Sequence, residues 1–312
     1  MNAADIAAQG AAKLTLGPVL FNWNPEVWRD FYFRIADEAP VDTVHLGEVV
    51  CSKRQPFFEK YIPEVAERLS AAGKEVVLSG LALVMSERER DGVQALARDA
   101  GDFMVEANDL SAAAPLTGRP HVIGPLVNVY NEGTLAYLAR QGAVRVSLPA
   151  ELPAKTIAIL AAANLTEIEV QAFGRLPLAI SARCYHARSR NLHKDGCQYV
   201  CGEDPDGMDV DTMDGKAFLT VNGTQTMSFH YLNLLEEVRS LRQLGVGRFR
   251  LWPHSCDMVA VSKLFRDVLD GVLDPVEASE LLADIAPHAD FANGYIHGRE
   301  GHTLVQGESL AV

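Results

Sequence analysis

The stretch Asp42–Glu48 reads DTVHLGE, a short apolar run that ends in a glycine and a glutamate. Runs of this kind recur along the chain, rich in Val, Ile, Leu and Phe and ending near Gly or Pro, as buried strands do. We expect eight such strands, and the other seven lie at Lys13–Phe21, Glu75–Ser79, Asp102–Ala107, His121–Tyr130, Val144–Pro149, Glu167–Gly174 and Arg248–Pro253.

Stretches with helical spacing separate these runs. Pro25 begins PEVWRDFYFRIAD, at the position where a helix tolerates proline best. Further on, Tyr231–Gly245 places Leu234, Val238 and Leu241 on one face, and its final glycine can end a helix. Strands that alternate with helices predict an α/β fold, a (β/α)8 TIM-like barrel, for which ~250 residues are typical. An open doubly wound sheet is the alternative.

No linker divides the chain, so we expect a single barrel-like domain over residues 1–312. More than seventy residues separate the last two predicted strands, and a long insertion in a barrel usually carries function. We interpret residues 181–230 as this insertion, with a cysteine-rich loop and a β-hairpin that turns at Asn222-Gly223. The acidic run Glu203–Asp214 reads as a solvated turn region, and residues from about 299 to 312 as a flexible tail.

Charge and hydropathy exclude several classes of protein. The formal net charge is −13, and an acidic surface repels phosphate backbones, so we expect no nucleic-acid partner. No apolar window is long enough for a membrane span. Residues 1–20 lack a basic start followed by a long apolar core, so we do not read them as a secretory signal. The expected compartment is the cytoplasm.

Polar side chains stand at or just beyond the carboxyl ends of the predicted strands. In a (β/α)8 barrel this end is the mouth of the active site. Loops are polar in any case, so each residue alone is a weak indication of function. The residues concerned are Glu48, Ser79, Glu106, Asn128, Glu151 and Gln171.

The chain has five cysteines, and three of them fall in SARCYHARSRNLHKDGCQYVCG, residues 181–202. Cys51 also follows a predicted strand end, which gives the pattern C-x132-C-x12-C-x3-C for Cys51, Cys184, Cys197 and Cys201. Clustered thiols in a reducing compartment are commonly metal ligands. Four thiolates suit structural zinc or an iron–sulfur cluster, and spacing alone does not separate the two. The alternative is four unrelated buried thiols.

The remaining cysteine and two nearby histidines are weaker candidates. Cys256 stands at the start of a helical pattern and reads as a packing residue rather than a ligand. His186 and His193 could donate hydrogen bonds to ligand sulfurs, although exposed loop histidines are the commoner case. The chain has no HExxH, GxSxG or P-loop motif.

Several blocks of sequence resemble the collagenase-like peptidase family U32, and specifically the branch that serves oxygen-independent ubiquinone biosynthesis. The resemblance runs from about Leu16 to about Tyr295. The blocks are LGEVVCSKR around Cys51, LALV at Leu81–Val84, EANDL at Glu106–Leu110, SARCYHARS around Cys184, VNGTQTMS at Val221–Ser228 and NGY at Asn293–Tyr295.

The resemblance implies a 4Fe-4S cluster held by Cys51, Cys184, Cys197 and Cys201, with residues 181–230 as the cluster-binding insertion. It implies an iron–sulfur subunit of a hydroxylase that acts, without oxygen, on the aromatic ring of ubiquinone precursors, with prephenate as the oxygen donor. The implied partners are a UbiU-like homologous subunit, which forms a heterodimer with the chain, and a UbiT-like sterol-carrier lipid protein.

Two other functions remain open. A related family member hydroxylates bases in tRNA or rRNA, but the net charge of −13 and the lack of a Lys/Arg stripe argue against that activity here. A non-catalytic iron–sulfur subunit, acting as an electron relay or a structural partner, is the other reading. Lys53, Arg54 and Arg183 lie beside proposed ligands. We expect them to stabilise a reduced cluster or to bind an anionic oxygen donor such as a dicarboxylate, and the alternative is that they are plain surface charges.

Overall fold

The computed structural model describes residues 11–311. Residues 1–10 and 312 lie outside the described part, and so does the first half of the N-terminal segment that we do not read as a secretory signal. Between residues 11 and 311, no helix is both long and apolar enough to cross a membrane.

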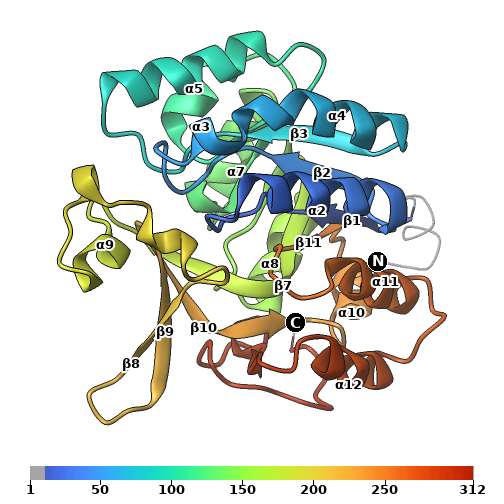
Figure 1. The fold of residues 1–312 in the computed structure, drawn as a ribbon. Helices are drawn as coiled ribbons and strands as arrows, with labels where there is room; N and C mark the ends of the chain where they lie inside the picture. The colour runs from blue at the N-terminus through green and yellow to red at the C-terminus, as the bar shows by residue number, and fades with distance from the viewer. Residues whose placement is uncertain (1–10, 312) are drawn as a thin grey trace.

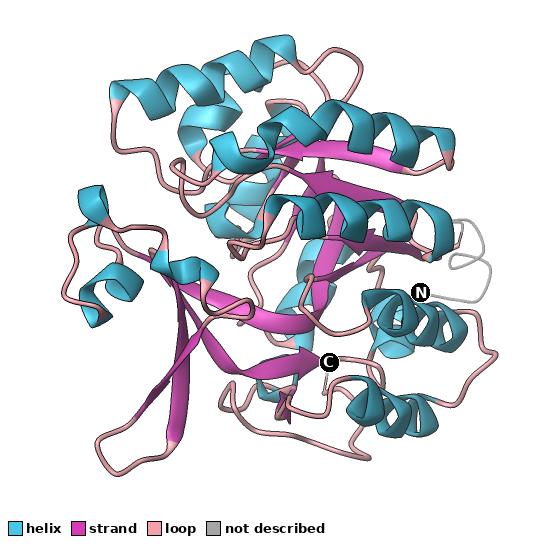
Figure 2. Ribbon diagram, in the orientation of Figure 1, coloured by secondary structure: helices cyan, strands magenta, loops and turns pink. Residues whose placement is uncertain are grey.

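Eight parallel strands form a closed barrel (Figures 1 and 2). Strand β11 pairs with both β1 and β7, as in Leu14↔Phe249 and Phe249↔Val170, and this double pairing closes the ring. The predicted (β/α)8 barrel is therefore confirmed, and the open sheet is wrong. The strands are β1 (Lys13–Leu16), β2 (Thr43–Leu46), β3 (Glu75–Ser79), β4 (Met104–Ala107), β5 (His121–Ile123), β6 (Ala143–Ser147), β7 (Glu167–Ile180) and β11 (Arg248–Leu251).

Helices pack around the outside of the barrel (Figure 1), and several of them begin at a side-chain cap, as α2 (Pro25–Glu38) does. Asn24 accepts hydrogen bonds from the backbone of Glu26 and Val27 ahead of Pro25, so the first long helix starts where the sequence predicts. The longer helices are α2 (Pro25–Glu38), α4 (Ile62–Ala71), α5 (Glu87–Asp99), α7 (Glu132–Arg140), α8 (Ala154–Ala162), α10 (Val238–Gln243), α11 (Met258–Leu269) and α12 (Pro275–Ile285). Short helices are α3 (Gln55–Phe58), α6 (Leu110–Ala113) and α9 (Tyr185–Ser189).

The barrel interior is charged rather than apolar. Arg250 bonds to Glu169 and to Glu106, each at 2.6 Å, and none of these three side chains is exposed. His45 lies 3.3 Å from Glu106. Buried charges are tolerated when they are paired, as these side chains are. Glu106, which we expected at the mouth, belongs to this interior group.

The long insertion builds an antiparallel extension on strand β7. β7 pairs with β10 (Gln225–Asn233), β10 with β9 (Ala217–Asn222), and β9 with β8 (Met208–Asp211). Figure 1 shows β8, β9 and α9, in yellow, projecting to one side of the barrel. The predicted hairpin is present, but Asn222 pairs with Gln225, so its turn residues are Gly223 and Thr224. β12 (Phe291–Ala292) adds a short parallel pairing to β10.

Several local expectations were wrong. The segment Tyr231–Gly245 starts as strand, because β10 runs to Asn233, and becomes helical only in α10. The run His121–Tyr130 leaves the barrel after Ile123 and makes a 3-10 turn at Pro125–Val127. Other predicted strands are also shorter than expected; for example, β1 ends at Leu16 and β11 at Leu251.

The acidic run is a solvated turn region only in part, because residues Met208–Asp211 form strand β8 and some of its carboxylates have partners. Asp204 contacts His186 at 2.8 Å, Asp206 accepts a hydrogen bond from the Ser255 backbone at 2.9 Å, and Asp209 belongs to strand β8. Several of its carboxylates therefore tie the insertion to itself and to the barrel. The segment from about residue 299 has one buried side chain, Val305, whose backbone exchanges hydrogen bonds with Asn293.

Candidate metal centre

The four predicted cysteines line one small pocket. Cys51 lies in the loop after β2, Cys184 caps α9, and Cys197 and Cys201 follow in the same loop of the insertion. Strands β2 and β7 both lead to this pocket from their carboxyl ends, as expected for a barrel. Lys53, Arg54, Lys194, Tyr199, Val200 and Gly223 complete its lining.

The Cys51 loop is held by a buried carboxylate. Glu48 Oε1 accepts hydrogen bonds from the backbone of Val50 at 2.7 Å and Cys51 at 2.8 Å. Gly47 precedes it with a φ of +129°, a conformation that side chains disfavour. The Gly and Glu of the LGE-x2-C block therefore fix the backbone of the loop that carries Cys51.

The hairpin turn joins the two cysteine-bearing segments. Thr224 Oγ1 donates to the carbonyl oxygen of Val50 at 3.0 Å, and the Thr224 carbonyl accepts from the Ser181 backbone at 2.9 Å. One residue thus contacts both the Cys51 loop and the start of the Cys184 loop. This explains how residues separated by more than one hundred positions come to share a pocket.

Cys184 is placed by the turn that follows it. The backbone N–H of Ala187 donates to Cys184 Sγ at 3.4 Å. His186, which reads in sequence as an ordinary loop histidine, is fully buried, and its Nε2 lies 2.8 Å from Asp204 Oδ2. His186 therefore fastens the loop to the acidic run, whereas His193 is exposed.

Arg54 is the charged residue most deeply placed at the pocket. Its side chain is 1% exposed, and it donates to the Leu20 carbonyl at 2.8 Å and to Asn222 Oδ1 at 2.9 Å. Burial lowers the pKa of Arg54, but Glu48, Cys201 and Cys51 raise it above its usual value, so the guanidinium stays charged. Arg54 is thus no surface charge.

The other two cations beside the cysteines differ from Arg54. Lys53 Nζ bonds to Asp195 Oδ1 at 2.9 Å and to the Lys194 carbonyl at 2.7 Å, so it ties the insertion loop to the Cys51 loop. Arg183 is exposed. Of the three cations beside proposed ligands, Lys53 and Arg54 therefore line the pocket, and Arg183 does not.

The electrostatics of the pocket favour thiolates once a metal binds. Burial raises the pKa of Cys51 and of Cys184, although Arg54 and, for Cys184, the Ala187 N–H lower it. Protonated thiols give up their protons when they ligate a metal. The positive charges of Arg54, Lys53 and Lys194 offset part of the negative charge that four thiolates bring together.

The spacing of the side chains bears on which metal group fits. Over residues 11–311, no three His, Cys, Asp or Glu side chains are grouped so that they could hold one metal ion. A single tetrahedral zinc needs its four ligands around one point. A 4Fe-4S cluster needs less proximity, because each thiolate binds a different iron.

Two larger clefts are lined by predicted strand-end residues, and the first adjoins the Cys51 loop. The first, of about 390 Å³, has polar lining residues that include Glu48, Ser52 and Arg88 and apolar ones that include Leu78 and Leu96. Ser52 directly follows Cys51, so this cleft and the cysteine pocket share one loop. Ser79 also lines the cleft, and the sequence offered no signal for Arg88.

The second cleft lies at the barrel mouth and has a volume of about 270 Å³. It gathers three of the predicted strand-end residues, Asn128, Glu151 and Gln171, and adds Tyr130, whose hydroxyl donates to Glu151. Burial, followed by the hydrogen bond to Glu151, raises the pKa of Tyr130 to about 12. The strand-end pattern therefore predicts residues of the mouth, although Glu48 and Ser79 line a different cleft.

Cys256 does not line the cysteine pocket. It is half-buried against the core ahead of α11, with its sulfur 3.7 Å from Met258 Sδ. Burial raises the pKa of its thiol to about 12. These features agree with packing rather than ligation.

The fold and the site define an α/β-barrel protein with a four-cysteine pocket at the carboxyl ends of its strands. The chain belongs to peptidase family U32, whose family model matches residues 31–306. The family resemblance seen in the sequence is therefore confirmed at this level.

Solved structures resemble the chain only broadly. A phospho-2-dehydro-3-deoxyheptonate aldolase from Thermotoga maritima has 13% identity and a TM-score of 0.45, over 90% of this chain and 72% of that one. A tryptophan synthase complex from Pyrococcus furiosus has 14% identity and a TM-score of 0.41, over 88% and 97%. A Prevotella bryantii endo-beta-mannanase/endo-beta-glucanase has 9% identity and a TM-score of 0.41, over 88% and 49%. Such scores carry no information about activity.

Proposed function

We propose that this chain is a UbiV-like member of family U32, the iron–sulfur subunit of an oxygen-independent hydroxylase that acts on the aromatic ring of ubiquinone precursors. The observation that carries the proposal is the single pocket lined by Cys51, Cys184, Cys197 and Cys201. A UbiU-like homologous subunit would complete a heterodimer, and a UbiT-like sterol-carrier protein would associate with it. The cytoplasm, as a reducing compartment, suits four free thiols.

The residues of the pocket fit a 4Fe-4S cluster. Four sulfurs and no other ligand type line it, which is the donor set of such clusters. The bound cluster would supply one-electron chemistry. The buried guanidinium of Arg54 would offset its negative charge, and hydrogen bonds such as Ala187 N–H to Cys184 Sγ would tune it.

The substrates would bind in the clefts beside the cysteines. The cleft with Leu78 and Leu96 offers an apolar wall for an aromatic ring next to the Cys51 loop. Arg88, exposed on the same cleft, could pair with a carboxylate of prephenate as the oxygen donor. Tyr130 and Glu151 could position polar groups at the barrel mouth.

Anaerobic purification with iron and sulfide assays tests the proposal. The protein should be brown and hold about four irons per chain. Ala variants of each pocket cysteine should lose iron, with Cys256→Ala as the matched control. A colourless protein that retains stoichiometric zinc would refute the cluster.

Activity then separates the proposed function from its alternatives. Co-expression with a UbiU-like subunit should restore ring hydroxylation in cells that lack the native pair, and pocket variants should not. Hydroxylated RNA bases in place of quinone would favour RNA modification, against which the net charge of −13 argues. Full hydroxylation by variants that hold no iron would favour the alternative in which the cluster is not catalytic and has a structural role.

A further inference from the structure

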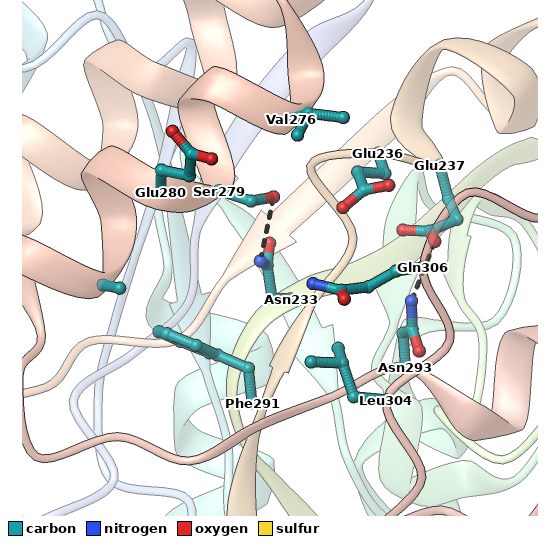
Figure 3. Close-up of a pocket in the computed structure, with 11 residues that line it drawn as sticks. Asn233, Glu236, Glu237, Val276, Ser279, Glu280, Phe291, Asn293, Leu304 and Gln306 are labelled. Atoms are coloured by element: carbon teal, nitrogen blue, oxygen red, sulfur yellow. Dashed lines mark hydrogen bonds between the residues drawn. The ribbon is translucent and has the colours of Figure 1, made fainter.

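Another pocket, with no cysteine in its lining, lies between α12, the end of β10 and residues 291–306 (Figure 3). Its volume is about 260 Å³, below the ~300–1,000 Å³ of sites for drug-sized ligands. It shares no lining residue with the cysteine pocket. Its walls are formed by Asn233, Glu236, Glu237, Val276, Ser279, Glu280, Ala283, Phe291, Asn293, Leu304 and Gln306.

Glu237 lines this pocket and has one buried carboxylate oxygen without a partner. The residue is 4% exposed, and its Oε1 accepts hydrogen bonds from Asn293 Nδ2 at 2.9 Å and His297 Nε2 at 3.1 Å. Its Oε2 has no hydrogen-bond partner in the described chain. Figure 3 shows this oxygen turned away from Asn293 and toward Glu236. A buried oxygen of this kind costs free energy until a donor reaches it.

The pocket is anionic at both sides. Glu236 lies next to Glu237, while Glu280 lies across the pocket on α12 (Figure 3). The eleven lining residues include no Lys or Arg. Burial raises the pKa of Glu237, and His297 and Asn293 lower it, so a cation beside Oε2 would favour the ionised form.

Apolar side chains form another part of the pocket lining. Val276, Phe291 and Leu304 provide this surface. A hydrated divalent ion does not gain from apolar walls, and over residues 11–311 no three acidic or histidine side chains are grouped to hold one metal ion. A ligand with charged ends and a methylene chain matches both features.

We propose that this pocket binds a small aliphatic diamine, with one ammonium at Glu236 and Glu237, the other near Glu280, and the methylene chain against the apolar wall. One ammonium donates to Glu237 Oε2 and satisfies it. The amide groups of Asn233 and Gln306, drawn between the acidic sides in Figure 3, line the path of the chain. This site is independent of the proposed hydroxylase function.

Calorimetric titration of the full chain with 1,4-diaminobutane tests the proposal, with butylamine and 1,4-butanediol as the one-charge and uncharged probes. The diamine should bind about tenfold more tightly than butylamine, and the diol should not bind. Glu237→Gln keeps an oxygen for Asn293 and should weaken the diamine roughly tenfold. Glu280→Gln, at an exposed position, should weaken it roughly threefold.

Glu277→Gln is the matched control, since Glu277 lies on α12 but does not line the pocket, and it should bind as the wild type does. Three results would overturn the proposal: no saturable binding of the diamine, equal binding of butylamine, or unchanged binding by both Glu237→Gln and Glu280→Gln. Displacement of the diamine by equimolar magnesium would also overturn it, because it would show a metal site.

Discussion

Arg54→Met should destabilise the protein far more than Arg183→Ala, although both arginines neighbour a proposed ligand. Arg54 makes two charged hydrogen bonds, to the Leu20 carbonyl and to Asn222 Oδ1. Each contributes about 1.5–3 kcal/mol, or about 3–6 kcal/mol together. Methionine fills part of the space and removes the cost of burying a charge, so we expect a net loss of about 3 kcal/mol.

Thermal unfolding of anaerobically purified protein measures this loss. For a chain larger than 250 residues, about 3 kcal/mol corresponds to a melting temperature lower by about 6 °C. Iron retention should also fall, because the hairpin turn that Arg54 holds lines the cysteine pocket. Arg183→Ala should melt within about 1 °C of the wild type, as exposed positions do. Equal melting temperatures for the two variants would refute the role given to the buried guanidinium.

The remaining predictions concern the hairpin turn, the fifth cysteine and the barrel interior. Gly223→Ala should lower the melting temperature, because residue 223 has a φ of +64° and an added Cβ would lie 2.5 Å from Arg54 Nη2. In the Arg54→Met background the same substitution should lower the melting temperature less. Equal losses in the wild-type and Arg54→Met backgrounds would contradict a clash between Cβ and Arg54. Cys256→Ala should keep wild-type iron content, since this cysteine lies outside the pocket, and an iron loss as large as that of a pocket variant would make it a ligand. Acid should destabilise the barrel through Glu169. Burial raises the pKa of Glu169, but Arg250 and other cations bring it down from 4.5 to about 2. The contribution of the Glu169 carboxylate to folding stability is therefore complete above pH 4.5 and is lost as pH falls through 2. Glu169→Gln should therefore show a shallower fall in melting temperature between pH 5 and 2 than the wild type, and an identical slope would count against the ion pairs.

Local patterns predicted the barrel and the set of pocket cysteines. A strand such as Thr43–Leu46 can be predicted because the segment carries apolar side chains and a glycine follows it. Both features belong to adjacent residues in the sequence. Cys184, Cys197 and Cys201 were grouped because they share one loop. Cys51 joined them because parallel strands of a barrel present their carboxyl ends to the same side.

Strand lengths were predicted less well than strand positions. The run His121–Tyr130 is apolar throughout, but only its first three residues pair in the barrel. Tyr231–Asn233 fits a helical pattern and forms a strand instead, because β7 and β12 offer it hydrogen-bond partners. Pairing with a distant segment overrides local propensity in such cases.

The sequence by itself determined the fold class and which cysteines meet. Only the tertiary structure decided which charged side chains are buried. Arg54 and Arg183 look alike beside their cysteines, but Arg54 meets Leu20 and Asn222 from distant segments, whereas Arg183 meets solvent. Glu237 likewise becomes a buried, half-satisfied carboxylate only because residues 291–306 fold over it. Burial and pairing depend on contacts between residues far apart in the chain, and no local pattern encodes them.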